Sequence, residues 1–195
     1  HALSTMLATL CVLLPAVVIG AGLQSPTRAL AGQWVTTLEN GVEVITHDAS
    51  KWNGQEGYPF ALFDPAVPFE QGAASIQFKL IDGGDDYTAG LAFGYQPGGT
   101  YYFVRYNTKD GNVALWRMEG PTRTVIAHGE AHEQLARGVW QDLRLEVDGR
   151  TVRAIAAGRL RVEHTLDEAP SGLLGLWTKP TATSAFKGLT IDPRR

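Results

Sequence analysis

Three aspartates lie close together in residues 81–87, which read IDGGDDY. Ca²⁺ prefers carboxylate and carbonyl oxygens on flexible loops. Asp82, Asp85 and Asp86 could therefore supply oxygen ligands to a calcium ion. Acidic residues beside glycines also occur in turns that bind no metal, so a solvated turn is the alternative. No other cofactor is expected.

Two imidazoles, those of His128 and His132, are four residues apart, with Glu130 and Glu133 beside them. If residues 128–137 form a short helix, this spacing puts both imidazoles on one face, as in some zinc sites. A third clear ligand is missing from the sequence pattern. A solvated loop is therefore the favoured interpretation of this segment.

Aromatic residues gather in two further stretches. One is the loop-rich segment of residues 51–60 (KWNGQEGYPF), and the other spans three successive apolar runs between residues 95 and 116. Tyrosine and tryptophan serve as core, as protein contacts or as platforms on which sugar rings stack. The candidates for ligand or partner contact are Trp52, Tyr58, Tyr102, Tyr106 and Trp116.

Strand alternation divides one of these groups. Successive side chains of a strand point to opposite faces of the sheet. Tyr102 and Tyr106 should therefore share one face, and Tyr101 and Phe103 the other. One of the two sets should be core.

Composition and charge exclude some classes of partner. The net charge is −3 and no Lys/Arg run is present, so nucleic acid is not an expected partner. Cys11 is the only cysteine, which excludes an intrachain disulfide and a cysteine-ligated metal site. The chain has 22 glycines and 10 prolines, spread between short apolar runs, which is typical of an all-β domain.

The first part of the chain is apolar. Residues 2–23 carry no charge, and as a helix they would span roughly 33 Å, enough to cross a bilayer. Cleavage after a signal would use the small-x-small motif Ala29-Leu30-Ala31, whereas the length of the run favours a retained anchor. Gly20 and Gly22 would permit close contact with another membrane helix. We therefore expect a single-pass membrane protein with its C-terminal domain in the periplasm or outside the cell.

The rest of the sequence predicts short strands. Asn40-Gly41, Asp110-Gly111 and Asp148-Gly149 are strong hairpin turns. These elements predict an all-β, two-sheet jelly-roll sandwich. We expect a transmembrane helix over residues 1–24, a linker over 25–32 and the sandwich over 33–192. The predicted strands are 33–38, 42–46, 60–63, 74–81, 88–95, 100–106, 113–118, 122–128, 140–147, 150–156, 160–166, 173–177 and 185–191.

Five segments have a distinctive strand pattern: 89–93 (AGLAF), 101–105 (YYFVR), 139–147 (VWQDLRLEV), 172–179 (GLLGLWTK) and 185–191 (AFKGLTI). They resemble the concanavalin A-like lectin/glucanase superfamily, particularly its laminin-G-like and 3-keto-disaccharide-hydrolase-like branches. The chain departs from many relatives at Lys187, where they carry an acidic residue after the closing phenylalanine. The resemblance covers residues of about 70–191 and implies the sandwich fold more strongly than any function.

The resemblance also defines what a catalytic site would need. Glycosidases of this fold use two carboxylates across a groove, commonly supplied as E-x-D-x-E on one strand. The nearest match is Glu146-Val147-Asp148-Gly149-Arg150, in which Arg150 replaces the second glutamate. Asp148 is explained better as the first residue of a tight turn.

Three functions are compatible with these features. The first is a non-catalytic accessory subunit of a larger bacterial membrane complex of respiratory or photosynthetic type, in contact with integral membrane subunits and the lipid bilayer. The alternative, which the resemblance implies, is an exported carbohydrate-binding, lectin-like module with a glycan as its partner. A glycoside hydrolase-like enzyme comes third. The length of the apolar segment favours the first.

Overall fold

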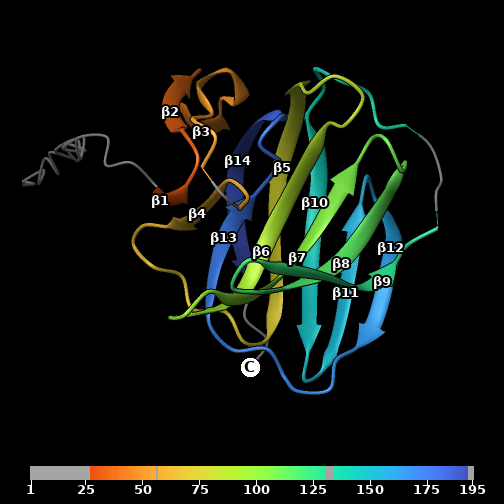
Figure 1. The fold of residues 1–195 in the computed structure, drawn as a ribbon. Coiled ribbons are helices and arrows are strands. Elements are labelled where there is room, and N and C mark those ends of the chain that lie inside the picture. Colours follow the sequence, from red (N-terminus) through yellow and green to blue (C-terminus); the bar gives the residue numbers. More distant parts are fainter. Residues whose placement is uncertain (1–26, 56, 131–133, 193–195) are drawn as a thin grey trace, which may run out of the picture.

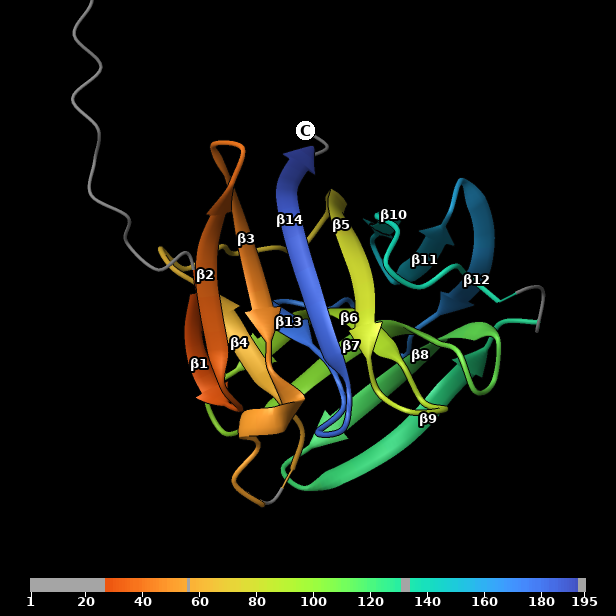
Figure 2. The same cartoon turned by 90° about the horizontal axis from the view of Figure 1, so that it is seen from above.

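The computed structural model of the chain describes residues 27–55, 57–130 and 134–192. These residues form an all-β sandwich of two seven-stranded antiparallel sheets (Figures 1 and 2). The strands are β1 (Thr27–Ala31), β2 (Trp34–Glu39), β3 (Val42–His47), β4 (Phe60–Phe63), β5 (Gly72–Asp82), β6 (Thr88–Gln96), β7 (Thr100–Asn107), β8 (Asn112–Glu119), β9 (Thr122–His128), β10 (Gln141–Asp148), β11 (Thr151–Ala156), β12 (Arg159–Thr165), β13 (Leu173–Trp177) and β14 (Thr183–Asp192), and a short 3₁₀-helix, η1, covers Ala49–Lys51.

In both sheets, a strand from the C-terminal part of the chain connects N-terminal strands to the others. Sheet A has the order β1-β4-β13-β6-β7-β8-β9, and sheet B has the order β12-β11-β10-β5-β14-β3-β2. In sheet A, β13 is the strand that joins β4 to β6, and in sheet B, β14 joins β5 to β3. The last two strands of the chain therefore connect its first strands to the rest of each sheet.

The alternation of apolar and polar residues decides which side chains lie between the sheets. On β10, Leu143, Leu145 and Val147 are buried, whereas Arg144 and Glu146 lie on the outer face and form an ion pair of 2.9 Å. Period-two alternation predicts this arrangement, because neighbouring strand residues point to opposite faces. The predicted sandwich is confirmed.

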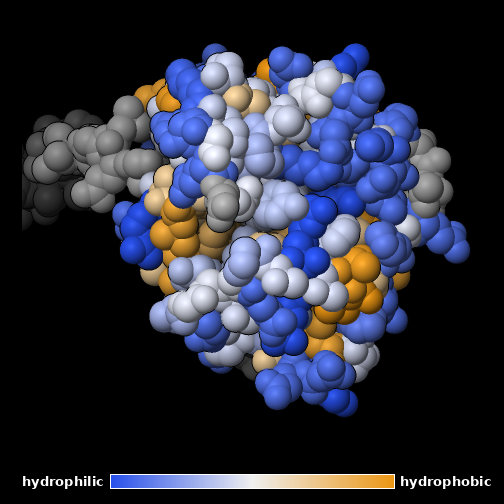
Figure 3. Space-filling model, viewed as in Figure 1, coloured by the Kyte–Doolittle hydropathy of each residue, from blue (hydrophilic) through white to orange (hydrophobic). Residues whose placement is uncertain are grey.

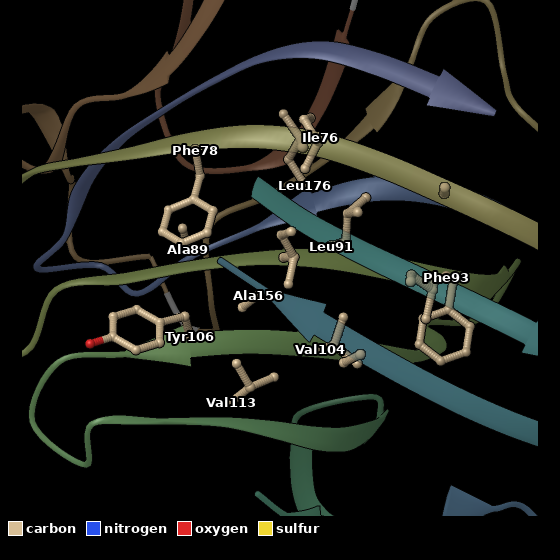
Figure 4. Packing of buried hydrophobic residues seen from close by; sticks show 14 of the residues in the cluster. Ile76, Phe78, Ala89, Leu91, Phe93, Val104, Tyr106, Val113, Ala156 and Leu176 are labelled. Carbon is tan, nitrogen blue, oxygen red and sulfur yellow. The ribbon is translucent and has the colours of Figure 1, made fainter. Parts of the chain in front are cut away.

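The core fills the space between the inner faces of the two sheets (Figure 4). Phe78 of β5 stacks on Tyr106 of β7, with ring centroids 6.2 Å apart. Phe93, Leu91 and Leu176 of sheet A are also fully buried. Complete burial of each such side chain contributes roughly 1.5–3 kcal/mol to folding, and this layer holds the sheets together.

The sandwich begins before the predicted boundary. Residues 27–31, predicted as part of a linker, form β1 and pair with β4 along the edge of sheet A. The indole Nε1 of Trp34 donates to the Ala31 carbonyl at 2.9 Å. The Ala29-Leu30-Ala31 motif therefore lies within a strand of the fold.

Two other predictions concern segments at the limits of the described chain. The predicted membrane helix, with Gly20 and Gly22, lies outside the described residues. Within the described ranges, no helix has the length and apolarity needed to cross a membrane. In the segment 128–137, His128 ends β9 and residues 134–136 have no regular structure, which agrees with the favoured loop rather than with the short-helix alternative. His132 and Glu133 lie outside the described residues.

Candidate functional site

The outer face of sheet A, which points away from sheet B, carries an aromatic cluster. Along β7, Tyr102, Val104 and Tyr106 point into the core, so Tyr101 and Phe103 point outward. Both outward rings are nevertheless buried. The cluster is formed by Phe60, Leu62, Ala92, Tyr101, Phe103, Met118 and Trp177, with Tyr58, Tyr95, Trp116 and Leu173 packed against it.

Stacked rings bury the centre of this cluster. Phe103 stacks on Trp177 with centroids 4.1 Å apart, and Phe60 stacks on Tyr101 at 4.5 Å. Gly90 of β6 pairs with Trp177 on one side, and a Cβ at Gly90 would lie 2.8 Å from the Val104 carbonyl oxygen. The absence of a side chain at Gly90 thus lets large neighbours fill this face. Burial raises the pKa of the Tyr101 hydroxyl, which keeps it protonated.

The solvent side of the cluster is formed by Tyr58 and Trp116, both half-buried. Tyr58 lies in the loop between η1 and β4, and its ring contacts Trp177 at 5.0 Å. Arg123 of β9 lies over both half-buried rings, with its guanidinium 4.8 Å from the Tyr58 centroid and 4.4 Å from that of Trp116.

Two hydrogen-bond donors at Trp116 have no partner within the part of the chain that the structure describes. Among the described residues, the indole Nε1 of Trp116 and one guanidinium nitrogen of Arg123 are buried and have no hydrogen-bond partner. The ring of His128 meets Trp116 edge-on at 6.0 Å. These donors are shielded from solvent and the Arg123 guanidinium lies over the Trp116 ring, so a ligand with an apolar face and many hydroxyl oxygens would reach ring and donors by displacing Arg123.

A buried arginine lies next to this platform. Arg105 is 2% exposed, and its guanidinium donates to Asp110 at 2.9 Å and to the Asn112 side chain at 3.1 Å. Burial lowers the pKa of Arg105, Asp110 offsets part of this effect, and Arg123 adds to it. The guanidinium lies 5.5 Å from the Trp116 centroid, so a polar network borders the platform on this side.

The three aspartates of the predicted calcium site have separate roles. Asp86 is held by Lys179 and by the amide of Asn107. Burial opposes ionisation of Asp86, but these two groups lower its pKa below the usual value. Asp82 accepts from the Gly83 backbone N–H at 2.8 Å, and Asp85 lines a different, open cavity. Within the described residues, no group of three or more metal-ligating side chains is present, and the calcium site stays a prediction.

The five predicted contact residues do not form one site. Only Tyr58 and Trp116 come together, through Arg123. Tyr106 is 3% exposed in the inter-sheet core, and it accepts a hydrogen bond from the Leu135 backbone N–H at 2.8 Å. Tyr102 also faces inward and lines a cavity of about 410 Å³ at the sandwich edge. Trp52 lies elsewhere, beside His47.

The candidate catalytic segment lies on the other sheet. Glu146 is on the outer face of sheet B, where it pairs with Arg144, and Asp148 is the last residue of β10 before the Gly149 turn. Neither carboxylate borders the aromatic platform. The residues that sequence reasoning missed are Arg105, Asp110, Asn112 and Arg123. Alternation along β7 could have placed Arg105 on the same face as Tyr101 and Phe103.

The surface around the platform is mostly hydrophilic. Figure 3 looks onto the side of the molecule that sheet A covers, and its hydrophobic residues gather in two separate areas with hydrophilic residues between them. Such a surface is polar enough for a hydrated ligand. It also limits the size of any continuous apolar contact.

Comparisons with known proteins give the fold. No protein-family model and no curated protein matches the sequence. Among solved structures, the chain is similar to the carbohydrate-binding module CBM66 from Bacillus subtilis, with a TM-score of 0.70 and 18% identity over 85% of this chain and 94% of that one. A Bacillus subtilis protein of unknown function with a galectin-like fold has a TM-score of 0.62 and 13% identity, over 87% of this chain and 90% of that one. The Bacillus licheniformis β-glucanase has a TM-score of 0.56 and 9% identity, over 89% and 94%. With these neighbours, the chain has the concanavalin A-like sandwich fold that its strand motifs predict.

Proposed function

We propose that this protein is a carbohydrate-binding, lectin-like protein and that its sugar site is the Tyr58–Trp116 platform on the outer face of sheet A. The observation that carries the proposal is the half-buried Trp116 ring under the Arg123 guanidinium, which a sugar would displace, together with two buried donors that have no partner among the described residues. The C–H face of a pyranose or furanose ring packs well on an indole. Its hydroxyl groups then need donors and acceptors at the edge of that indole.

The polar network supplies those groups. Asp110 has a side chain that is 46% exposed, so one carboxylate can accept from sugar hydroxyls while it stays paired with Arg105. Asn112 and His128 add further polar edges near the same ring. Because Arg105 is buried and fixed at both ends of its guanidinium, these groups keep their positions without a ligand.

The comparisons support this proposal over the membrane-complex hypothesis. One similar structure is named as a carbohydrate-binding module, and another has a galectin-like fold. The feature that favoured an accessory subunit, the apolar run of residues 2–23, lies outside the described residues. The sugar-binding proposal, in contrast, rests on side chains that the structure describes.

A glycan-binding measurement tests the proposal. The intact chain is screened against a panel of immobilised oligosaccharides, and affinities for its best ligands are then measured by calorimetry. Trp116→Ala should weaken binding about tenfold or more, as expected for a tryptophan at the centre of a binding site.

Trp140→Ala is the matched control. Trp140 is also half-buried and also contacted by cations, Lys79 at 4.6 Å and Lys187 at 4.2 Å, but it lies over sheet B. The Trp140→Ala variant should leave the affinity for the glycan unchanged. A panel without any ligand, or equal losses in the two variants, would overturn the proposal.

A further inference from the structure

A second buried arginine, Arg161, lies at the edge of the sandwich near the platform. It belongs to β12 and is 9% exposed. The pairing of β11 with β12 is irregular between Ala154 and Ile155, so that both Arg161 and the next residue, Val162, are buried. This bulge turns a charged side chain inward where simple alternation would leave it outside.

The charge of Arg161 has no counter-ion among the residues that the structure describes. Its Nε donates to the Ala156 carbonyl at 3.1 Å, but its Nη2 is buried and lacks a hydrogen-bond partner among the described residues. No carboxylate of the described chain lies within ion-pair distance of it. Arg105, the other buried arginine, is paired with Asp110. A buried unpaired charge is costly, and an anion from outside the protein would remove that cost.

Arg161 lines an open pocket of about 310 Å³ between β9 and β12. Gly129 forms one wall, and a Cβ there would lie 2.5 Å from the Arg161 carbonyl oxygen, so the two segments approach closely. Glu130 and Glu163 also line the pocket, but both are exposed. Glu163 is already paired with Arg153. The pocket thus has a cation at its buried side and solvated carboxylates at its rim.

His128 connects this pocket to the sugar platform. Its ring lies 6.0 Å from the Trp116 ring, and the same residue lines the pocket. A sugar stacked on Trp116 would therefore extend past His128 toward Arg161. The platform and the pocket are neighbouring parts of one surface.

We propose that the β9–β12 pocket binds an anionic substituent, a carboxylate or a sulfate ester, of the saccharide that stacks on Trp116. This inference rests on the proposed function and makes the ligand an acidic glycan. Guanidinium groups match the oxygens of carboxylates and sulfates in geometry as well as charge. The exposed rim carboxylates of Glu130 and Glu163 oppose the anion only weakly, because solvent and salt screen them.

Paired ligands that differ only in charge test the proposal. Oligogalacturonate is compared with its methyl ester, and a sulfated oligosaccharide with its unsulfated form, by calorimetry on the intact chain. We expect the charged member of at least one pair to bind about tenfold tighter. The pair that shows the difference identifies the anionic group as carboxylate or sulfate.

Variants separate this inference from the proposed function. Arg161→Gln should remove the preference for the charged member and leave affinity for the neutral one unchanged, whereas Trp116→Ala should weaken both. Equal binding of both members by the unmodified protein would overturn the anion pocket and leave the sugar platform standing. A charge preference that survives in Arg161→Gln would also overturn it.

A measurement on the unmodified protein covers the case in which Arg161→Gln does not fold. The arginine Nε–H signals are followed by NMR during addition of sodium sulfate or sodium glucuronate at constant ionic strength. The Arg161 signal should shift saturably, and that of Arg153, which is half-buried on the neighbouring strand β11 and paired with Glu163, should not. If the Arg161 signal responds to neither anion, the anion pocket is contradicted. If it responds but the protein binds no glycan, the anion pocket stands and only the sugar platform is contradicted.

Discussion

Arg123 and Trp116 come from neighbouring strands, β9 and β8, and the guanidinium of Arg123 lies 4.4 Å from the centroid of the Trp116 ring. The same guanidinium contacts Tyr58, which precedes it by more than sixty positions in the sequence. One side chain thus links the loop after η1 to the far edge of sheet A. The following predictions test this link and the features around it.

The cation–aromatic contact should contribute measurably to stability. A double-mutant cycle with Arg123→Ala and Trp116→Ala should give a coupling free energy of about 0.5–1 kcal/mol, because both groups are half-buried. Urea unfolding followed by circular dichroism provides the measurement. The same cycle between Arg123 and Trp140, which lie on different sheets, should give a coupling near zero. Equal couplings in the two cycles would show that the contact is not specific.

The Arg105–Asp110 pair should matter more than an exposed pair. Asp110→Asn leaves the buried Arg105 guanidinium without its counter-ion, and we expect the free energy of unfolding to fall by about 1–2 kcal/mol. This loss is smaller than for a fully buried pair, because the Asp110 side chain is half exposed. Glu119→Gln breaks the 2.8 Å pair with Arg117, in which both side chains are exposed, and should cost less than about 0.5 kcal/mol. A larger loss for Glu119→Gln would contradict this interpretation of Arg105.

His47 should make the fold sensitive to mild acid. Its ring is fully buried between Trp34 and Trp52, with Nδ1 2.9 Å from the Ala182 carbonyl. Burial lowers the pKa of His47 below 6.5, although the Ala182 carbonyl and Asp48 partly offset this. The unfolded chain therefore takes up a proton at a higher pH than the folded chain. Stability is complete above pH 6.5 and falls as the pH drops from there toward the folded pKa.

Urea unfolding at several pH values tests this dependence. The loss attributable to His47 should reach at most about 1.4 kcal/mol per pH unit. His47→Asn keeps a side-chain N–H donor and cannot titrate in this range, so its stability should change less between neutral pH and pH of about 5.5. Parallel curves for the two proteins would show that His47 is not the group responsible.

Strand β1 should be necessary for full stability. A chain that begins at Gly32 loses the ladder with β4 and the Ala31 carbonyl that accepts from Trp34. Several strand hydrogen bonds at about 0.5–1.5 kcal/mol each make a net loss of about 2 kcal/mol a reasonable expectation. A chain that begins at Ser25 keeps β1 and serves as control. Equal unfolding midpoints for the two chains would mean that β1 is dispensable.

The sequence predicts most of the strands because local alternation and turn residues determine them. Leu143, Leu145 and Val147 show the pattern clearly, and the Asp148-Gly149 turn ends the strand where expected. β1 was missed because it depends on a distant partner. Its five residues, TRALA, show little alternation, and they become a strand through pairing with residues 60–63.

The site was harder to predict than the fold. Alternation correctly separates Tyr102 and Tyr106 from Tyr101 and Phe103, but it does not say which set lies between the sheets, because both faces of sheet A are apolar at this point. Arg123 could not be assigned to the site from its neighbours in sequence. Its role depends on the loop that carries Tyr58, and this proximity exists only in the folded chain.

The positions of β13 and β14 have a consequence for how the protein reaches its folded state. These strands follow all the other strands of the sandwich in the sequence, yet each connects the N-terminal strands to the rest of its sheet. Until residues 173–192 are available, β1 to β4 have no hydrogen-bonded connection to the remaining strands, and their edges are open to other chains. Folding of the sandwich should therefore be completed only once residues 173–192 are available, and a chain truncated before Leu173 should aggregate rather than form a smaller stable domain.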